Sequence, residues 1–254
     1  MVHSFQKDQL RVEQYATRKE MGDAAAKTAI EAVVRAQGEK DQICILFAAA
    51  PSQNEFLTTL TESDQIDWSK ITALQLDEYM GFDPEAPQGF ARFLYDRVFS
   101  KVPIGNCQMF RCDCPDIEEE RLRYTRLFAD YPPDIAFIGI GENTHIAFND
   151  PDKCSFGDPE MVRTVELAPE SREQQVNDGC FKTLADVPEI ALTLTVPAIM
   201  AAKQIFCMVP ASSKAKAIYE TLNTPHIGEH CPASILRTHP NATLYLDNDS
   251  ASLL

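Results

Sequence analysis

Residues 137–151 read FIGIGENTHIAFNDP, an apolar strand that runs into a loop rich in polar side chains. The apolar residues Ile135–Ile138 predict a strand buried on both faces, as in a parallel sheet covered by helices. Gly139 and Gly141 then allow the backbone to turn tightly and to approach a ligand closely. Ligands of open α/β sheets bind beyond the carboxyl ends of strands, so this loop is a candidate site.

The loop contains a histidine followed five residues later by a carboxylate, His145 and Asp150, with Asn143 just before the histidine. A carboxylate near an imidazole can hold one tautomer of the ring and move its titration toward neutrality, which suits general acid–base catalysis. A polar surface loop with an exposed histidine is the alternative interpretation of the same residues.

The composition predicts a globular protein that binds neither nucleic acid nor membrane. A hydrophobic content of 44% with 24% charged residues is ordinary for a globular chain. The formal net charge of −15 would repel nucleic acids and anionic membranes, so an anionic substrate would need a local cationic pocket. The chain contains no apolar run of about eighteen residues, and its N-terminus lacks the pattern of a secretory signal.

Eight cysteines are spread along the chain, several of them inside apolar runs such as QICILF and QIFCMV. Reduced cysteines behave as small hydrophobic residues in such runs, which predicts a cytoplasmic protein without disulfides. Cys112 and Cys114 form a CxC pair, but no second pair or nearby histidine completes a zinc pattern, so no metal is expected.

Strand and helix signals alternate along the chain with short connections. Strands are predicted at residues 43–49, 71–76, 107–111, 135–138, 161–167, 190–194, 204–209 and 242–246. One or two helices are predicted in residues 8–37. Further helices are predicted to end at residues 60 and 222, and others to span residues 90–100, 117–129, 171–181, 198–202 and 231–236. This order predicts a Rossmann-like, doubly wound α/β fold with a mainly parallel sheet and helices on both faces. One domain over residues 1–254 is expected, with an excursion around 150–180 that lies over the site.

Three further strand ends carry polar residues. Asp77 and Glu78 directly follow the strand at 71–76, where a solvated acid pair is the alternative to a functional one. Ser52, Gln53 and Asn54 stand between the strand at 43–49 and the next helix, a junction that suits either a phosphate or a plain helix cap. The junction after the strand at 204–209 adds Lys214 to hydroxyl groups and unpaired amides, which makes it the better anion site.

Four motifs together resemble the glucosamine-6-phosphate deaminase/isomerase family. They are LDEYMGF at 76–82, GIGENTHIAFNDP at 139–151, VPASSKAKAI at 209–218 and CPASILRTHPNATLYLD at 231–247. Their order and spacing match the family over nearly the whole chain, and HIAFN before an acidic residue and proline separates it from the related 6-phosphogluconolactonases. The resemblance implies a doubly wound sheet, no metal or other cofactor, and conversion of glucosamine 6-phosphate and water to fructose 6-phosphate and ammonia in amino-sugar catabolism.

The resemblance also implies a role for each matching residue. Asp77 matches the family's general base, which moves a proton from C2 to C1 of the opened sugar. His145 matches the histidine that assists ring opening, and Asp150 matches the acidic residue that orients it. Lys214 matches a lysine that holds the phosphate, and Ser52 falls in the first loop that contacts the phosphate.

Two departures from the family pattern lie beside the histidine. Many members have an aspartate and a glycine there, where this chain has Asn143 and Thr144. Asn143 still offers a hydrogen bond to His145 and is included in the expected catalytic set. Thr144 occupies a position where glycine permits a positive φ, and its branched side chain is expected to lie near the sugar together with Gly141.

The expected phosphate site departs from the family as well. The segment APSQNE at 50–55 replaces a glycine-rich turn, so the side chains of Ser52, Gln53 and Asn54 are expected to replace backbone donors. A phosphate-binding arginine is expected between residues 163 and 180, where Arg163 and Arg172 are the candidates. Arg172 joins Glu78 and Lys214 in the predicted substrate-binding set.

Two other functions remain open at this point: lactone hydrolysis on 6-phosphogluconolactone, and binding of a sugar phosphate without catalysis. A lactone needs a base-activated water and no proton transfer between carbons, so Asp77 would matter little in a lactonase. The sequence leaves open the epimer of the sugar, a homo-oligomer and allosteric activation.

Overall fold

The computed structural model describes residues 1–151, 153–177 and 179–254, and its centre is a mainly parallel sheet. Neighbouring strands pair in parallel throughout, except at one edge, where β1 and β2 form an antiparallel hairpin. In spatial order, the eight strands of the described residues are β1 (His3–Lys7), β2 (Leu10–Tyr15), β11 (Ala242–Asp247), β10 (Gln204–Val209), β7 (Ile135–Ile138), β3 (Ile43–Phe47), β4 (Ile71–Gln75) and β6 (Asn106–Gln108). The predicted doubly wound α/β class is confirmed.

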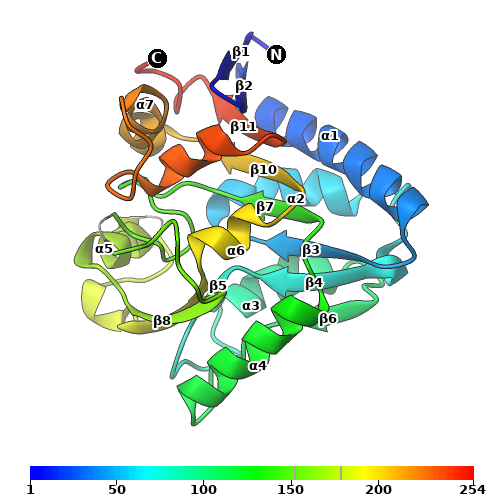
Figure 1. Ribbon diagram of the computed structural model, residues 1–254, viewed down its shortest axis with the longest axis vertical. Helices are drawn as coiled ribbons and strands as arrows, with labels where there is room; N and C mark the ends of the chain where they lie inside the picture. The colour runs from blue at the N-terminus through cyan, green and yellow to red at the C-terminus, as the bar shows by residue number, and fades with distance from the viewer. Residues whose placement is uncertain (152, 178) are drawn as a thin grey trace.

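Helices cover both faces of this sheet (Figure 1). The helices are α1 (Arg18–Glu39), α2 (Asn54–Thr61), α3 (Phe90–Leu94), α4 (Ile117–Asp130), α5 (Pro169–Asn177), α6 (Val196–Met200) and α7 (Ala215–Asn223), with a π-helical turn η3 (Tyr95–Phe99) after α3. Short 3₁₀ helices lie at η1 (Pro51–Gln53), η2 (Trp68–Lys70), η4 (Leu184–Asp186), η5 (Ser212–Lys214) and η6 (Pro232–Thr238).

Alternate residues of each central strand enter different cores, because successive side chains of a strand point to opposite faces. In β7, Ile135 and Phe137 pack with α1 and α2, whereas Ala136 and Ile138 pack with α4, α6 and α7. Both faces are apolar, which is why the parallel strands appear in the sequence as continuous hydrophobic runs.

A second sheet, not anticipated from the sequence, is antiparallel and contains β5 (Asp77–Tyr79), β9 (Ile190–Leu194) and β8 (Val162–Glu166). Residues 77–79, predicted to lie just beyond the end of a strand, form a strand of their own in this sheet. The peptide groups of Leu76 join the two sheets: its N–H donates to the carbonyl oxygen of Phe47 at 3.2 Å, and its carbonyl oxygen accepts from the N–H of Leu194 at 2.7 Å. The main chain just before Asp77 is therefore held by both sheets.

The prediction of one or two helices in residues 8–37 is wrong at its start. Residues 10–15 form β2, whose burial largely alternates, and only from Arg18 does the chain become helical. The strand forms because β11, more than two hundred residues later, offers a parallel partner, with Leu244 opposite Val12. Local helix propensity is overridden by this pairing.

Among the described residues, no helix is both long enough and apolar enough to cross a membrane.

Candidate active site

A cavity opens where the carboxyl ends of β3, β7 and β10 meet the start of β5. It brings together Asp77, His145 and Lys214, three residues from distant parts of the sequence. We call it the strand-end cavity, and its lining residues are Arg18, Ala48, Ala49, Ala50, Pro51, Ser52, Leu76, Asp77, Phe90, Gly139, Ile140, Gly141, His145, Ala147, Phe148, Gln174, Gln175, Pro210, Ala211, Ser213 and Lys214.

Asp77 is the acidic group of the strand-end cavity. It is 9% exposed and pairs with Thr193 in the small sheet, and its carbonyl oxygen accepts from Nε2 of Gln75 at 2.7 Å. Burial raises the pKa of the Asp77 carboxyl well above its usual range, and the charge of Glu78 raises it further. A carboxylate with a raised pKa is a stronger base than an exposed aspartate, as proton abstraction from carbon requires.

Glu78, predicted as a substrate-binding residue, lies outside the strand-end cavity as far as the described residues show. Its carboxylate accepts hydrogen bonds from the main-chain N–H groups of Tyr79 at 3.0 Å, Phe90 at 3.1 Å and Ala91 at 2.7 Å. Burial raises the pKa of Glu78, and these hydrogen bonds oppose that increase. The side chain thus satisfies the first turn of α3, where helix N–H groups have no partner within the helix.

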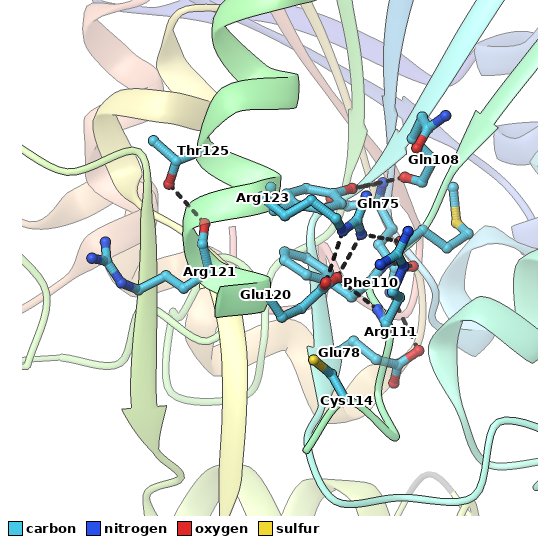
Figure 2. A network of polar contacts seen from close by, with 12 residues as sticks. Gln75, Glu78, Gln108, Phe110, Arg111, Cys114, Glu120, Arg121, Arg123 and Thr125 are labelled. Atoms are coloured by element: carbon cyan, nitrogen blue, oxygen red, sulfur yellow. Dashed lines mark hydrogen bonds and ion pairs between the residues drawn. The ribbon is translucent and has the colours of Figure 1, made fainter. Parts of the chain in front are cut away.

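Gln75 connects this acid pair to the body of the protein (Figure 2). Its Nε2 lies 3.3 Å from Oε2 of Glu78, and its Oε1 accepts from the N–H of Phe110 at 3.1 Å. The polar network continues on α4, where Glu120 accepts from the N–H of Arg111 at 2.8 Å and pairs with Arg123. The end of β4 is fixed by these contacts, and Asp77 follows it by two residues.

The imidazole of His145 is oriented from its Nδ1 side. Nδ1 lies 2.7 Å from Oδ1 of Asn143, 3.1 Å from Oγ of Ser171 and 3.5 Å from Oδ1 of Asp150. The amide nitrogen of Asn143 donates to Asp150 at 3.0 Å, which leaves its oxygen as the acceptor facing the ring. In the neutral ring Nδ1 is therefore the nitrogen that carries the proton, and Nε2 is the acceptor left for a ligand.

Asp150 anchors this arrangement from behind the imidazole. Burial raises the pKa of its carboxyl, but hydrogen bonds from His145, Ser171 and Asn143 outweigh burial and lower the pKa to about 2. The group is therefore ionised at neutral pH and supplies the negative charge that the neutral amide of Asn143 lacks.

Gly141 and Thr144 shape the loop around the imidazole. A Cβ atom at Gly141 would lie 2.2 Å from both Cε1 and Nε2 of His145, so only glycine fits against the ring. Thr144 has a φ of 73°, in the region expected for a glycine, but its buried side chain does not line the strand-end cavity within the described part of the chain. The expectation that the Thr144 side chain lies near the sugar is therefore not supported. Its N–H donates to the carbonyl oxygen of Gly141, and its carbonyl oxygen accepts from the N–H of Ala233.

Lys214 supplies the cation expected for a phosphate. It is buried, lies at the end of η5, and its Nζ is 4.0 Å from Oε1 of Glu142. The turn before it is held by Ala211, which has a φ of 86° and donates its N–H to the carboxylate of Asp247. Ser52 faces the same cavity from η1, beside Gly139.

Three of the residues predicted to bind phosphate have other partners, and the described lining of the cavity does not include them. Gln53 is fully buried and donates to the carbonyl oxygen of Ile138 at 3.2 Å, while Asn54 accepts from Nε of Arg97 at 2.6 Å. Arg172 donates to the carbonyl oxygens of Leu184 at 2.9 Å and Val187 at 3.0 Å. These residues fix the loops around the site and do not reach into it. The other candidate arginine, at position 163, pairs with an aspartate at 3.1 Å.

Sequence reasoning missed four polar residues of this region: Arg18, Ser171, Gln174 and Gln175. The last three lie on α5, within the segment expected to lie over the site, but their side-chain directions depend on the position of that helix. Arg18 begins α1, where Thr17 caps the helix by accepting from the N–H of Glu20 at 3.2 Å. The sequence ATRKE carries this capping signal, which would have placed a helix start there.

Comparison with known proteins agrees with this geometry. The family described as glucosamine-6-phosphate isomerases/6-phosphogluconolactonase matches residues 16–245. A glucosamine-6-phosphate deaminase from Listeria innocua is 33% identical over 231 residues, which is 91% of this chain and 96% of the relative. One from Lactobacillus delbrueckii is 36% identical over 192 residues, covering 76% of this chain and 80% of the relative.

Solved structures of deaminases and lactonases of this kind also resemble the chain. A monomeric glucosamine-6-phosphate deaminase superimposes with a TM-score of 0.85 and 28% identity, covering 96% of this chain and 99% of that one. A 6-phosphogluconolactonase from Thermotoga maritima shares the fold, with a TM-score of 0.75, 17% identity, and coverage of 94% and 99%. The chain therefore belongs to the glucosamine-6-phosphate isomerase/6-phosphogluconolactonase family.

Proposed function

We propose that this protein is a glucosamine-6-phosphate deaminase that converts glucosamine 6-phosphate and water to fructose 6-phosphate and ammonia. The observation that carries the proposal is that Asp77, His145 and Lys214 line one cavity. A carbon-acid reaction needs a base, a ring-opening group and a grip on the substrate's far end in one place. The names of the relatives point to the same reaction.

His145 opens the sugar ring. Its Nε2 accepts the proton of the C1 hydroxyl group and returns it to the ring oxygen as the C1–O5 bond breaks. Asn143 and Asp150 hold the protonated Nδ1 on the opposite side of the ring, so Nε2 remains the exchanging atom through the step.

Asp77 carries out the isomerisation. Its carboxylate takes the proton from C2 of the open aldehyde while O1 takes up a proton released by the substrate's ammonium group, which gives an enolamine, and the carboxyl group then delivers the C2 proton to C1. The product is a 2-imino sugar at C2 with a reduced C1. Burial favours the neutral form of Asp77 and makes it the stronger base, which assists removal of a weakly acidic carbon proton.

Water completes the reaction. It adds to the C2 imine carbon to form a carbinolamine, the C–N bond then breaks with proton transfer to nitrogen, and ammonia leaves with the C2 carbonyl of fructose 6-phosphate in place. One water is consumed and one ammonia released, so the net reaction is an isomerisation coupled to hydrolysis.

Lys214 holds the phosphate at the far end of the substrate. Binding energy from a group that does not react fixes C2 near Asp77 and makes proton transfer effectively intramolecular. The buried ammonium offsets the repulsion that the chain's net charge of −15 would exert on an anionic sugar.

The test is ammonia release from glucosamine 6-phosphate, measured beside hydrolysis of 6-phosphogluconolactone. A deaminase releases ammonia, and the Asp77→Asn variant loses that activity. Hydrolysis of the lactone without ammonia release, unaffected by Asp77→Asn, would instead identify a lactonase. Binding of both sugar phosphates without turnover of either would leave only a sensor.

A further inference from the structure

We propose that Arg18, at the start of α1, binds the substrate phosphate together with Lys214. The inference rests on the proposed function for the identity of the substrate, while the anion-binding role follows from the geometry of Arg18 itself. Arg18 is the only arginine among the described residues that line the strand-end cavity.

The guanidinium of Arg18 is held in place and still has donors for an anion. Its Nε donates to Oε2 of Glu55 at 2.8 Å, and its Nη2 donates to the carbonyl oxygen of Pro51. A guanidinium carries five N–H donors in a fixed plane, and within the described residues no hydrogen bond is assigned to Nη1. About two thirds of the side chain is screened from solvent, since its relative exposure is 34%.

The turn that Arg18 contacts is poor in backbone donors. Pro51 has no N–H group, and the N–H of Gln53 donates to the carbonyl oxygen of Ala50 at 2.9 Å. A phosphate bound here therefore needs side-chain donors in place of a glycine-rich cradle. Arg18 and Ser52 supply them from one wall of the cavity, and Ser213 and Lys214 supply them from the turn after β10.

Other arginines near the cavity are committed elsewhere. Arg172 bonds to two main-chain carbonyls, and Arg97 bonds to Asn54 with its guanidinium 3.8 Å from the centre of the Phe93 ring. Arg97 lines a neighbouring cavity that shares the wall formed by residues 49–51 with the first. The guanidinium contact with the anion thus falls to Arg18, through Nη1.

A purely structural role for Arg18, as a tie between α1 and α2, makes a different prediction from a binding role. The tie needs Glu55, because the ion pair joins the two helices. Binding of phosphate does not need Glu55, whose charge partly neutralises the guanidinium. Glu55→Gln therefore weakens a structural tie but leaves phosphate affinity equal or tighter.

The experiment measures the dissociation constant of inorganic phosphate by calorimetry, and its inhibition constant against glucosamine 6-phosphate, for the full chain and three variants. We expect Arg18→Gln to weaken phosphate by about tenfold or more, the loss typical of a charge-assisted hydrogen bond. Glu55→Gln should bind phosphate at least as tightly as the parent protein. The matched control is Arg92→Gln, which removes an arginine whose ion pairs with Glu85 and Asp96 lie outside the cavity lining, and it should leave both constants unchanged.

Each outcome decides the matter. Unchanged phosphate binding in Arg18→Gln overturns the proposal, and so does equal weakening by Arg18→Gln and Glu55→Gln. If the parent protein releases no ammonia from any amino-sugar phosphate, yet Arg18→Gln alone weakens phosphate binding, the proposed function fails and Arg18 remains an anion ligand.

Discussion

Oδ1 of Asn143 lies 2.7 Å from Nδ1 of His145, so a neutral amide contacts the imidazole directly. The negative charge is 3.5 Å away on Asp150, to which the same asparagine donates through its amide nitrogen. Orientation and charge are therefore supplied by separate residues. Ser171, on α5, contacts both the imidazole and Asp150 and so helps to hold the two groups together.

Ser171→Ala should lower kcat for ammonia release by about tenfold, because the hydroxyl group that donates to Asp150 and contacts the imidazole of His145 is lost. Ser171→Thr restores a hydroxyl group and should recover most of the activity. Steady-state assays at a fixed pH check this, with thermal unfolding as the control for folding. Equal activity in the alanine variant and the parent would show that Asn143 alone orients the ring.

Gly141→Ala should lower kcat by about a hundredfold, since the added Cβ would lie 2.2 Å from the imidazole and must displace it. The matched control is Gly38→Ala on α1, where a Cβ meets nothing within 4 Å. That change should leave activity intact and stabilise the helix by about 0.5–1 kcal/mol. The two variants, compared by kcat and by urea unfolding, separate displacement of the ring from a general effect of losing a glycine. Full activity in Gly141→Ala would contradict the expected contact.

Asp77→Asn should lower kcat by about 10²–10⁴-fold and at the same time stabilise the protein near neutral pH. The folded-state pKa of Asp77 is raised above its unfolded value, so the ionised group costs stability as pH rises through that interval. An amide does not titrate. The gain in unfolding free energy of the variant should therefore disappear below about pH 4, where the Asp77 carboxyl of the parent is neutral in both the folded and the unfolded protein. Urea unfolding at pH 4 and pH 7 measures the difference. A variant less stable than the parent at pH 7 would refute the buried-charge interpretation.

Glu78→Gln should move the acidic limb of kcat/KM to lower pH. Burial is the main cause of the raised pKa of Asp77 and the charge of Glu78 is the second, so neutralising Glu78 lowers that pKa. The variant also leaves N–H groups of α3 less well satisfied, which should cost about 1–3 kcal/mol of unfolding free energy. pH–rate profiles at saturating and limiting substrate test this, and an acidic limb that does not move would exclude coupling between the two carboxylates.

The central strands could be predicted from the sequence because they are buried on both faces. Ile135–Ile138 and Ile205–Val209 are runs of apolar residues, and the carboxyl ends of their strands necessarily meet at one edge of a parallel sheet. That convergence is why the polar residues after each strand, His145 and Lys214 among them, line a common cavity.

The remaining features depend on contacts between distant segments. β2 is stabilised by β11 at the other end of the chain, and a local pattern cannot reveal that partner. Arg18 reaches the cavity only because α1 starts beside η1, and Glu78 is drawn away from it by the N–H groups of α3. Side-chain direction at these positions is set by tertiary packing, which spacing along the sequence does not encode.

The main chain of Leu76 is hydrogen-bonded to both sheets, so the position of the Asp77 carboxylate depends on both of them. A displacement of β9 by a fraction of an ångström is transmitted through one peptide group to the carboxylate that we propose faces C2. Thr193, opposite Asp77 on β9, also accepts from the N–H of Phe148 in the cavity wall. Laboratory evolution toward amino sugars of another size should therefore find useful changes on β9, in positions that never touch the sugar.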